Sequence, residues 1–149
     1  MPATKFRTNL RATSGFVADE LFLAGVSFAA SGAYKWVMPG SIFGEVVPAT
    51  GASNKYPLGV IQNNPAAAGI ARVRVFGKTI IAASLATCNL QNGMWITVGS
   101  GGYTQEACGL ANARWSGSTI AACTANGVQY GEAYLIGPSF TACSLFSGS

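Results

Sequence analysis

Apolar residues occur along this chain in short segments. In several of these segments, apolar and polar residues alternate. Glycine-containing turn dipeptides separate the runs, so most pieces are too short for a helix of ordinary length. Many short segments of this kind are typical of the strands of a barrel or sandwich. The expected strands are Ala33–Met38, Ser41–Val47, Pro57–Gln62, Ala71–Phe76, Thr79–Ala83, Met94–Val98, Thr119–Cys123 and Ala133–Ile136.

The pattern predicts an all-β fold: a compact small β-barrel or β-sandwich with at most one or two short helical turns, expected around Ser84–Leu90. Asn92-Gly93 and Asn126-Gly127 are expected to close hairpins, because Asn and Gly tolerate positive φ angles. Residues 1–15 mix basic, polar and isolated apolar positions without a period. We therefore expect an extended N-terminal arm over 1–15 and a single β domain over 16–149.

Charge is scarce in this sequence. Only 9% of the 149 residues are Asp, Glu, Lys or Arg, whereas about 25% is ordinary for a soluble domain. Half of the residues are hydrophobic, yet no run approaches the roughly 20 apolar residues of a membrane-spanning helix. Asp19 and Glu20 precede the longest apolar stretch, where a secretory signal would carry basic residues. The sequence thus predicts neither a membrane protein nor a signal peptide, and it favours burial of apolar surface in an oligomer.

The net charge of +4 is too small and too dispersed to indicate nucleic-acid binding. The densest basic group within the expected domain is Arg72, Arg74 and Lys78. Arg72 and Arg74 would share one face of a strand, and Val73 and Val75 the other. This group is predicted to be a solvated strand face.

The four cysteines, Cys88, Cys108, Cys123 and Cys143, are separated by 20, 15 and 20 residues. They are either buried thiols or disulfide-bonded cysteines, and three pairings are open. A zinc site is not expected, because no two cysteines lie two to four residues apart and the chain has no histidine.

The absence of histidine also removes the commonest general base. A hydrolase would have to use carboxylates such as Glu45, Glu106 and Glu132. The stretch 99–102 lacks the Lys-Ser/Thr of a phosphate-binding loop and is expected to be a turn. No catalytic residue, cofactor or metal is therefore predicted. Trp36, Trp95 and Trp115 are expected to be core or interface anchors, although a carbohydrate-binding platform is an alternative use of them.

Three stretches carry a resemblance to a known class of proteins. SGAYKWV (31–37), PLGVIQNNPAAAGIARVRVFGKTI (57–80) and GEAYLIGP (131–138) occur in that order, with a small-residue stretch leading to Asn92-Gly93 between the last two. In order and spacing, the chain resembles the small head decoration, or cement, proteins of tailed bacteriophages from about residue 30 to 138.

The resemblance implies a non-enzymatic homotrimer on the exterior of the virion capsid, assembled in the host cytoplasm. Its partners would be other copies of itself and the major capsid protein, whose expanded lattice it would stabilise, with no nucleic acid or membrane involved. The arm would contact the shell or a neighbouring copy through Lys5, Phe6, Arg7, Leu10 and Arg11. The main alternative is a virion or cell-surface glycan-binding module that uses Trp or Tyr faces, and a carboxylate hydrolase is a more remote one.

Overall fold

The computed structural model describes residues 16–29, 32–50, 57–84, 90–106, 110–116 and 128–141. Within these ranges the chain forms nine strands and one turn of 3-10 helix, so the prediction of an all-β fold is confirmed. The elements are β1 (Ala18–Ala24), β2 (Trp36–Pro39), β3 (Glu45–Pro48), β4 (Gly59–Ile61), β5 (Ile70–Ser84), β6 (Trp95–Val98), η1 (Ser100–Gly102), β7 (Thr104–Glu106), β8 (Leu110–Trp115) and β9 (Val128–Thr141).

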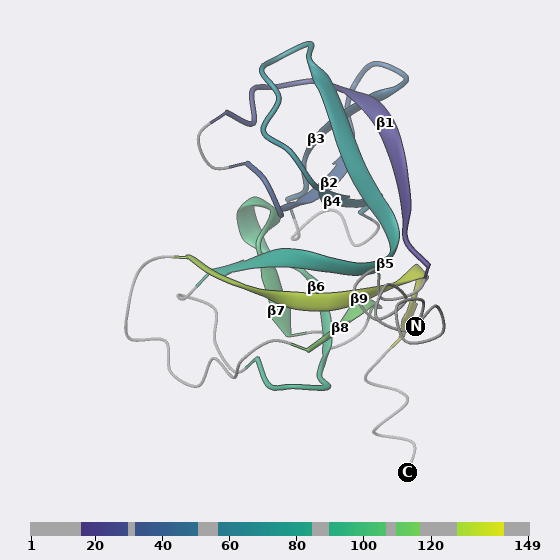
Figure 1. The fold of residues 1–149 in the computed structure, drawn as a ribbon, viewed down its shortest axis with the longest axis vertical. Coiled ribbons are helices and arrows are strands. Elements are labelled where there is room, and N and C mark those ends of the chain that lie inside the picture. Colours follow the sequence, from purple (N-terminus) through teal and green to yellow (C-terminus); the bar gives the residue numbers. More distant parts are fainter. Residues whose placement is uncertain are drawn as a thin grey trace, which may run out of the picture.

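The long strand β5 organises the whole molecule. Its first half lies along β1, and its second half turns away and lies along β9 (Figure 1). The pairing order β1-β3-β2-β4-β5 returns to β1, and the order β5-β7-β6-β8-β9 returns to β5. The strands therefore form two small closed rings that share β5. Neither is a regular barrel, because β5 meets β7 at a single residue pair, Ala83 with Thr104.

Gly77 lies where β5 passes from one ring to the other. Phe76 is the last residue of β5 that pairs with β1, and Gly77 is the first that pairs with β9. Gly77 has a φ of 94°, a conformation that residues with a Cβ atom rarely adopt. A Cβ atom here would also collide with the carbonyl oxygen of Phe16. Glycine at position 77 thus allows β5 to bend, and it allows the backbone of Phe16, just before β1, to lie against the bend.

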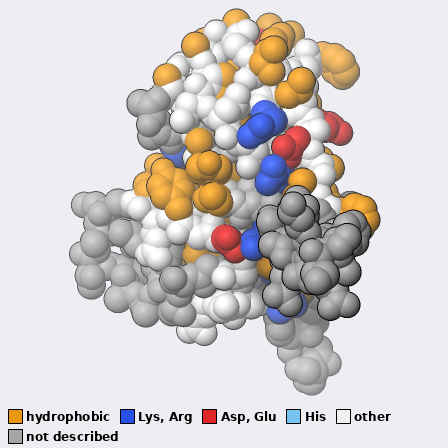
Figure 2. All heavy atoms as spheres, in the orientation of Figure 1, with side chains coloured by type: hydrophobic (Ala, Val, Ile, Leu, Met, Phe, Trp, Pro, Cys, Tyr) orange, Lys and Arg blue, Asp and Glu red, His pale blue; other side chains and the backbone are white. Residues whose placement is uncertain are grey.

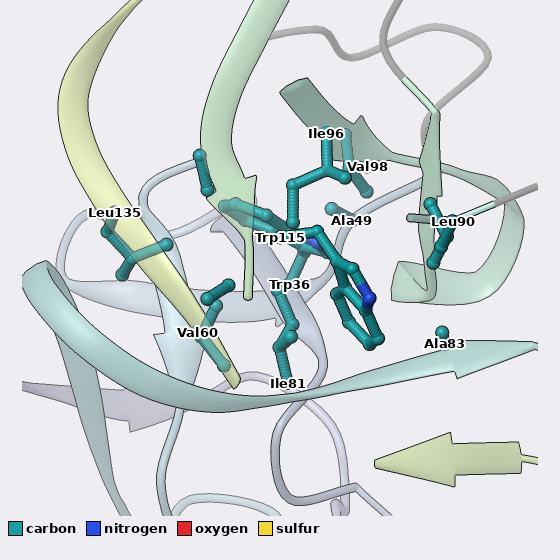
Figure 3. Close-up of a cluster of buried hydrophobic side chains, with 12 residues drawn as sticks. Trp36, Ala49, Val60, Ile81, Ala83, Leu90, Ile96, Val98, Trp115 and Leu135 are labelled. Atoms are coloured by element: carbon teal, nitrogen blue, oxygen red, sulfur yellow. The ribbon is translucent and has the colours of Figure 1, made fainter. Parts of the chain in front are cut away.

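Each ring has its own apolar core. In the ring that contains β1, the core consists of Ala24, Phe28, Val37, Val46, Ile61, Ala71 and Val73. The larger core belongs mainly to the second ring and includes Trp36, Ile81, Leu90, Ile96, Val98, Trp115 and Leu135 (Figure 3).

Trp36 connects the two rings. It comes from β2 in the first ring, but its side chain packs into the core of the second. There its Nε1 donates a buried hydrogen bond of 3.1 Å to Oγ1 of Thr104 on β7. The two rings are therefore joined by a side chain as well as by the shared strand.

Several predicted elements differ from the observed ones. The strands expected at Ala71–Phe76 and Thr79–Ala83 are one strand, β5, while β1, β7 and β8 were not predicted. Asn92-Gly93 does form a turn, in which Met94 N donates to Gln91 O over 3.0 Å. The turn does not close a hairpin, however, because β6 pairs with β7 and β8. Thr119–Cys123, Asn126-Gly127 and most of Ser84–Leu90 lie outside the described residues.

Candidate functional site

The outward-facing side of β5 and its neighbours is the most unusual surface of the described chain. Along β5, Ala71, Val73, Thr79, Ile81 and Ala83 are buried, so the even-numbered residues point to the other side of the strand, where Ala82 is also buried but the larger side chains are not. Arg72 is exposed while Val73 is buried, as the predicted division of this strand requires. The prediction of a solvated basic face holds only in part, because Arg74 and Lys78 are partly covered and ion-paired. The outward positions nevertheless include Ile70, Phe76 and Ile80, which are large and apolar and remain exposed.

Exposed apolar side chains form several groups over this surface. On the face seen in Figure 2, they gather in separate clusters with basic and acidic side chains between them. Leu21 and Leu23 project from β1, and Leu23 lies directly opposite the exposed Ile70. Large exposed apolar patches on a soluble protein mark places where another molecule binds. Over the described part of the chain, the exposed large apolar residues are Phe16, Val17, Leu21, Leu23, Val26, Ile42, Phe43, Ile70, Phe76, Ile80, Val128, Tyr130 and Tyr134.

A compact charge cluster lies among these apolar groups. Nε of Arg74 donates to Oδ1 of Asp19 over 2.7 Å, and the second guanidinium nitrogen bonds Oδ2 over 3.1 Å. Arg72 lies 3.8 Å from the same carboxylate. The Arg74 hydrogen bonds, helped by the charges of Arg74 and Arg72, lower the pKa of Asp19, although partial burial opposes the shift. The cluster therefore pins β1 to β5 with a bidentate ion pair.

Asp19→Asn is expected to lower stability by about 1 kcal/mol at pH 7, because the charge-assisted pair across β1 and β5 is lost. The pKa of Asp19 is lower in the folded than in the unfolded chain. The pair therefore stabilises the fold fully above the unfolded pKa and stops doing so as pH falls through the folded pKa. Urea unfolding at a series of pH values should show the gap between wild type and variant closing below about pH 4. A gap of constant size down to pH 2 would contradict this assignment.

A second ion pair lies farther along β5. Nζ of Lys78 is 3.0 Å from Oε2 of Glu132 on β9. The hydrogen bond to Glu132 and the charge of that carboxylate raise the pKa of Lys78. The same stretch of surface carries Tyr130, whose ring meets that of Tyr34 edge to face at 5.9 Å.

An apolar hollow opens where the two rings meet. It has a volume of about 330 Å³ and is lined by Phe16, Phe76, Gly77, Lys78, Tyr134, Leu135 and Ile136. Of these described residues, Lys78 supplies the cation and Tyr134 a hydroxyl group, and the other five offer carbon surface or backbone. Gly77 contributes to the shape directly, because its bend separates the parts of β5 that form the walls. The hollow suits an apolar group better than a polar one.

A turn between β2 and β3 presents two apolar side chains to solvent. Phe43 is 103% exposed and Ile42 is 64% exposed. The backbone beneath them is fixed: Gly40 N donates to Glu45 O, Glu45 N to Ile42 O and Leu23 N to Gly44 O, all within 3.1 Å. Gly44 makes the turn feasible with a φ of 87°. We call Ile42 and Phe43 the apolar tip. The sequence predicted a strand from Ser41, although Ile-Phe enclosed by glycines at 40 and 44 was a signal for such a turn.

Trp36 and Trp115 are not available for the alternative use as a carbohydrate platform. Both indoles are buried, at 2% and 0% exposure, so they are core anchors, as the main interpretation expected. Trp95 is partly buried, and the guanidinium of Arg114 lies over its ring at 4.7 Å.

The carboxylates considered for a hydrolase lie on three different strands, β3, β7 and β9. Glu132 is paired with Lys78, while Glu45 and Glu106 lie on β3 and β7, in different rings. Among the described residues no three acidic, histidine or cysteine side chains form a group able to hold a metal ion. The arm residues Lys5, Phe6, Arg7, Leu10 and Arg11, and the cysteines at 88, 108, 123 and 143, lie outside the described residues. Nor do the described ranges contain a helix whose length and hydropathy would let it cross a bilayer.

A scan against models of known protein families gives no match, and a search of curated proteins finds no similar sequence. Among solved structures, the fold is similar to that of the N base of head fiber gp8.5 of bacteriophage phi29. The TM-score is 0.58 and the identity 13%, over 81% of this chain and 95% of the other. At this identity the likeness establishes a shared fold.

Proposed function

We propose that this protein is a structural component of a tailed-phage head: a decoration, or cement, protein that binds the outer surface of the expanded shell as a homotrimer. The observation that carries the proposal is the likeness of fold to the base of a phage head fiber, which extends over 81% of the chain. The ordered motifs at 31–37, 57–80 and 131–138 support it independently, because they resemble head decoration proteins. We infer a structural role without catalysis or cofactor.

The exposed apolar groups fit this role physically. A surface with few charges and many exposed apolar side chains becomes stable when neighbouring subunits cover it. A protein that binds only the expanded lattice stabilises that lattice by the difference between its affinities for the two states. Three linked copies bind several shell sites at once, so weak individual contacts combine into firm attachment.

Binding to phage heads tests the proposal. In solution, light scattering should give a mass of three chains of 15.3 kDa each. Sedimentation with the heads of its own phage should show saturable binding to expanded heads and none to unexpanded ones, and bound protein should raise the temperature at which heads release DNA. A monomer that ignores expanded heads would overturn the proposal. Binding to glycans instead would favour the alternative module, acting through exposed tyrosines such as Tyr130 and Tyr134.

The arm can be tested in the same assay. Deleting residues 1–15 is expected to weaken head binding while the circular dichroism and melting temperature of the domain stay unchanged. Two matched variants separate its contributions: Phe6 and Leu10 to serine, and Lys5, Arg7 and Arg11 to glutamine. The difference in head affinity between wild type and the second variant should disappear in high salt, because salt screens exposed charge pairs. Full affinity after the deletion would remove the arm from the binding surface.

A further inference from the structure

We propose that residues 5–11 of the arm of one copy add a strand to the free edge of β1 in a second copy, and that this contact repeats around the trimer. The inference deepens the proposed function, on which it rests for the number of copies. It names the surface that receives the arm and the chemistry by which β1 recognises it.

The first half of β1 has an edge that no described strand covers. Leu23 N donates to Gly44 O on the side away from β5. Backbone groups alternate in direction along a strand, so the N–H and C=O groups of Asp19 and Leu21 point to the same side. β3 pairs with β1 only at Leu23 and Ala24 and does not extend that far. The groups of Asp19 and Leu21 therefore form an edge to which another strand can pair.

The side chains on the two faces of this edge differ in chemistry. Phe22 packs against the core of the first ring, so Leu21 points to the outer face of β1, where it is 68% exposed. Glu20 points to the same face as Phe22 but is exposed, and no ion pair of its carboxylate occurs among the described residues. A strand added at the edge meets an apolar side chain on one face and an unpaired carboxylate on the other.

The segment 5–11 of the arm matches both faces. The arm as a whole has no period, but within this segment the basic residues occupy odd positions and the large apolar residues even positions: Lys5, Arg7 and Arg11 against Phe6 and Leu10. In an extended strand the two sets lie on opposite faces. The basic set can therefore lie beside Glu20 while the apolar set lies beside Leu21. A second β1 is a poorer occupant, because two Glu20 carboxylates would meet at the edge.

The arm leaves its own domain on the wrong side to cover its own edge. Phe16, where the arm joins the domain, lines the hollow together with Gly77 and Ile136 and so lies on the β5 and β9 side of β1. The free edge is on the opposite side, towards β3. The linker 12–15 lets Arg11 lie at most about 17 Å from Phe16, which restricts the contact to an adjacent copy. Because arm and edge are different surfaces, the contact runs head to tail and closes when its rotation is one third of a turn.

Site-specific photo-crosslinking tests the contact directly. The full-length protein is prepared with p-benzoylphenylalanine in place of Phe6, and half of the sample is isotopically labelled. Irradiation of the trimer should give adducts between labelled and unlabelled chains, at or beside Leu21. Adducts within one chain, adducts away from β1, or no adduct between chains would each overturn the inference. So would adducts formed only with the major capsid protein on heads, since the arm would then bind the shell.

Amide exchange measured by NMR reports the backbone pairing itself. The comparison is between the full-length protein and its Thr8→Pro, Asn9→Pro variant, which keeps every basic and large apolar residue of the arm. Adjacent amides of a strand point in opposite directions, so one of the two prolines removes a donor that faces β1. The Leu21 amide should exchange about 10-fold or more faster in the variant. The Glu20 amide, which points to β5, is the internal control and should be unchanged. Equal exchange at Leu21 in both proteins would mean that no strand is added there.

Substitutions in β1 supply a third readout, the oligomeric state in sedimentation equilibrium. Leu21→Pro removes an N–H that points away from β5, whereas Leu21→Ala shortens the same side chain and keeps it. The proline variant should associate about 3- to 10-fold more weakly per contact than the alanine variant. Equal association of the two would contradict backbone pairing at this edge.

Charge reversal tests the choice of occupant. Glu20→Lys should weaken each contact about 2- to 5-fold, and changing Lys5, Arg7 and Arg11 to glutamate in the same chain should restore it. Glu106→Lys, at an exposed carboxylate on β7 in the other ring, is the matched control and should leave the trimer intact. Glu20→Lys protein that stays as firmly trimeric as wild type and binds heads would refute the contact while leaving the proposed function standing. A wild-type protein that is monomeric would refute both.

Discussion

Replacing Gly77 by alanine is expected to destabilise the protein by roughly 3 kcal/mol or more. Two costs add up at this position. A φ of 94° is unfavourable for any residue with a side chain, and the new Cβ would collide with the Phe16 carbonyl, which is backbone and cannot rotate away. Relief requires β5 to straighten or the chain before β1 to move, and either change disturbs pairing in both rings. Urea unfolding followed by circular dichroism measures the loss, with a melting temperature lower by roughly 6–12 °C.

Gly44→Ala is the matched control for Gly77→Ala. Gly44 also has a positive φ, of 87°, but a Cβ atom there would meet nothing within 4 Å. Only the conformational cost applies, so we expect a loss of about 1–2 kcal/mol. The difference between the two variants isolates the close passage of the chain at Phe16. Equal losses would mean that the collision is relieved by a small shift and that the bend at Gly77 tolerates a side chain.

Gly77 also explains why the sequence predicted two strands where there is one. A glycine inside an alternating apolar pattern is usually a sign of a turn or a bulge, so the pattern was divided after Phe76. The alternation in the first half was predicted correctly, because Val73 is buried while its neighbour Arg72 is exposed. What local sequence could not reveal is that the strand continues through the glycine, since its two halves pair with partners about 55 residues away on either side.

The three strands that were not predicted carry no local strand pattern, for a different reason in each case. β1 is exposed along most of its length, so its sequence ADELFLA lacks the apolar–polar alternation of a half-buried strand. β7 is three residues long and β8, LANARW, contains residues with low strand propensity. Their pairing with β6 and β9 is set by the tertiary structure. The apolar residues of β1 are therefore visible in the sequence, but their exposure is not.

The residues of the candidate interaction surface could not be predicted from the sequence either. From the scarcity of charge, the sequence favoured burial of apolar surface in an oligomer. It could not say which residues form that surface. Leu23 and Ile70 become neighbours only through the antiparallel register of β1 and β5, and the hollow exists only because β5 bends where β9 joins it. Such long-range placement depends on the fold and leaves no local pattern.

Trp36→Ala is expected to cost about 3–5 kcal/mol, because it leaves a cavity in the larger core and removes the side chain that joins the two rings. The indole is 2% exposed and packs among the apolar residues of the second ring. Trp95→Ala is the control: that indole is partly buried and covered on one side by Arg114, so its loss should cost about 1 kcal/mol. Unfolding in urea would measure both. Similar costs for the two would contradict a special role for Trp36.

A conservative change at Trp36 separates packing from hydrogen bonding. Trp36→Phe keeps an aromatic ring in the core but removes the donor to Thr104 Oγ1, for an expected cost of about 1–2 kcal/mol. If Trp36 couples the rings, Trp36→Ala should also make unfolding less cooperative, because the shared β5 and smaller contacts such as that of Val60 with the larger core would then be the links left between them. Hydrogen exchange should show amides of one ring opening before those of the other, whereas the wild type opens both together. A cooperative Trp36→Ala protein would mean that β5 and the remaining contacts between the rings are enough to couple the two halves.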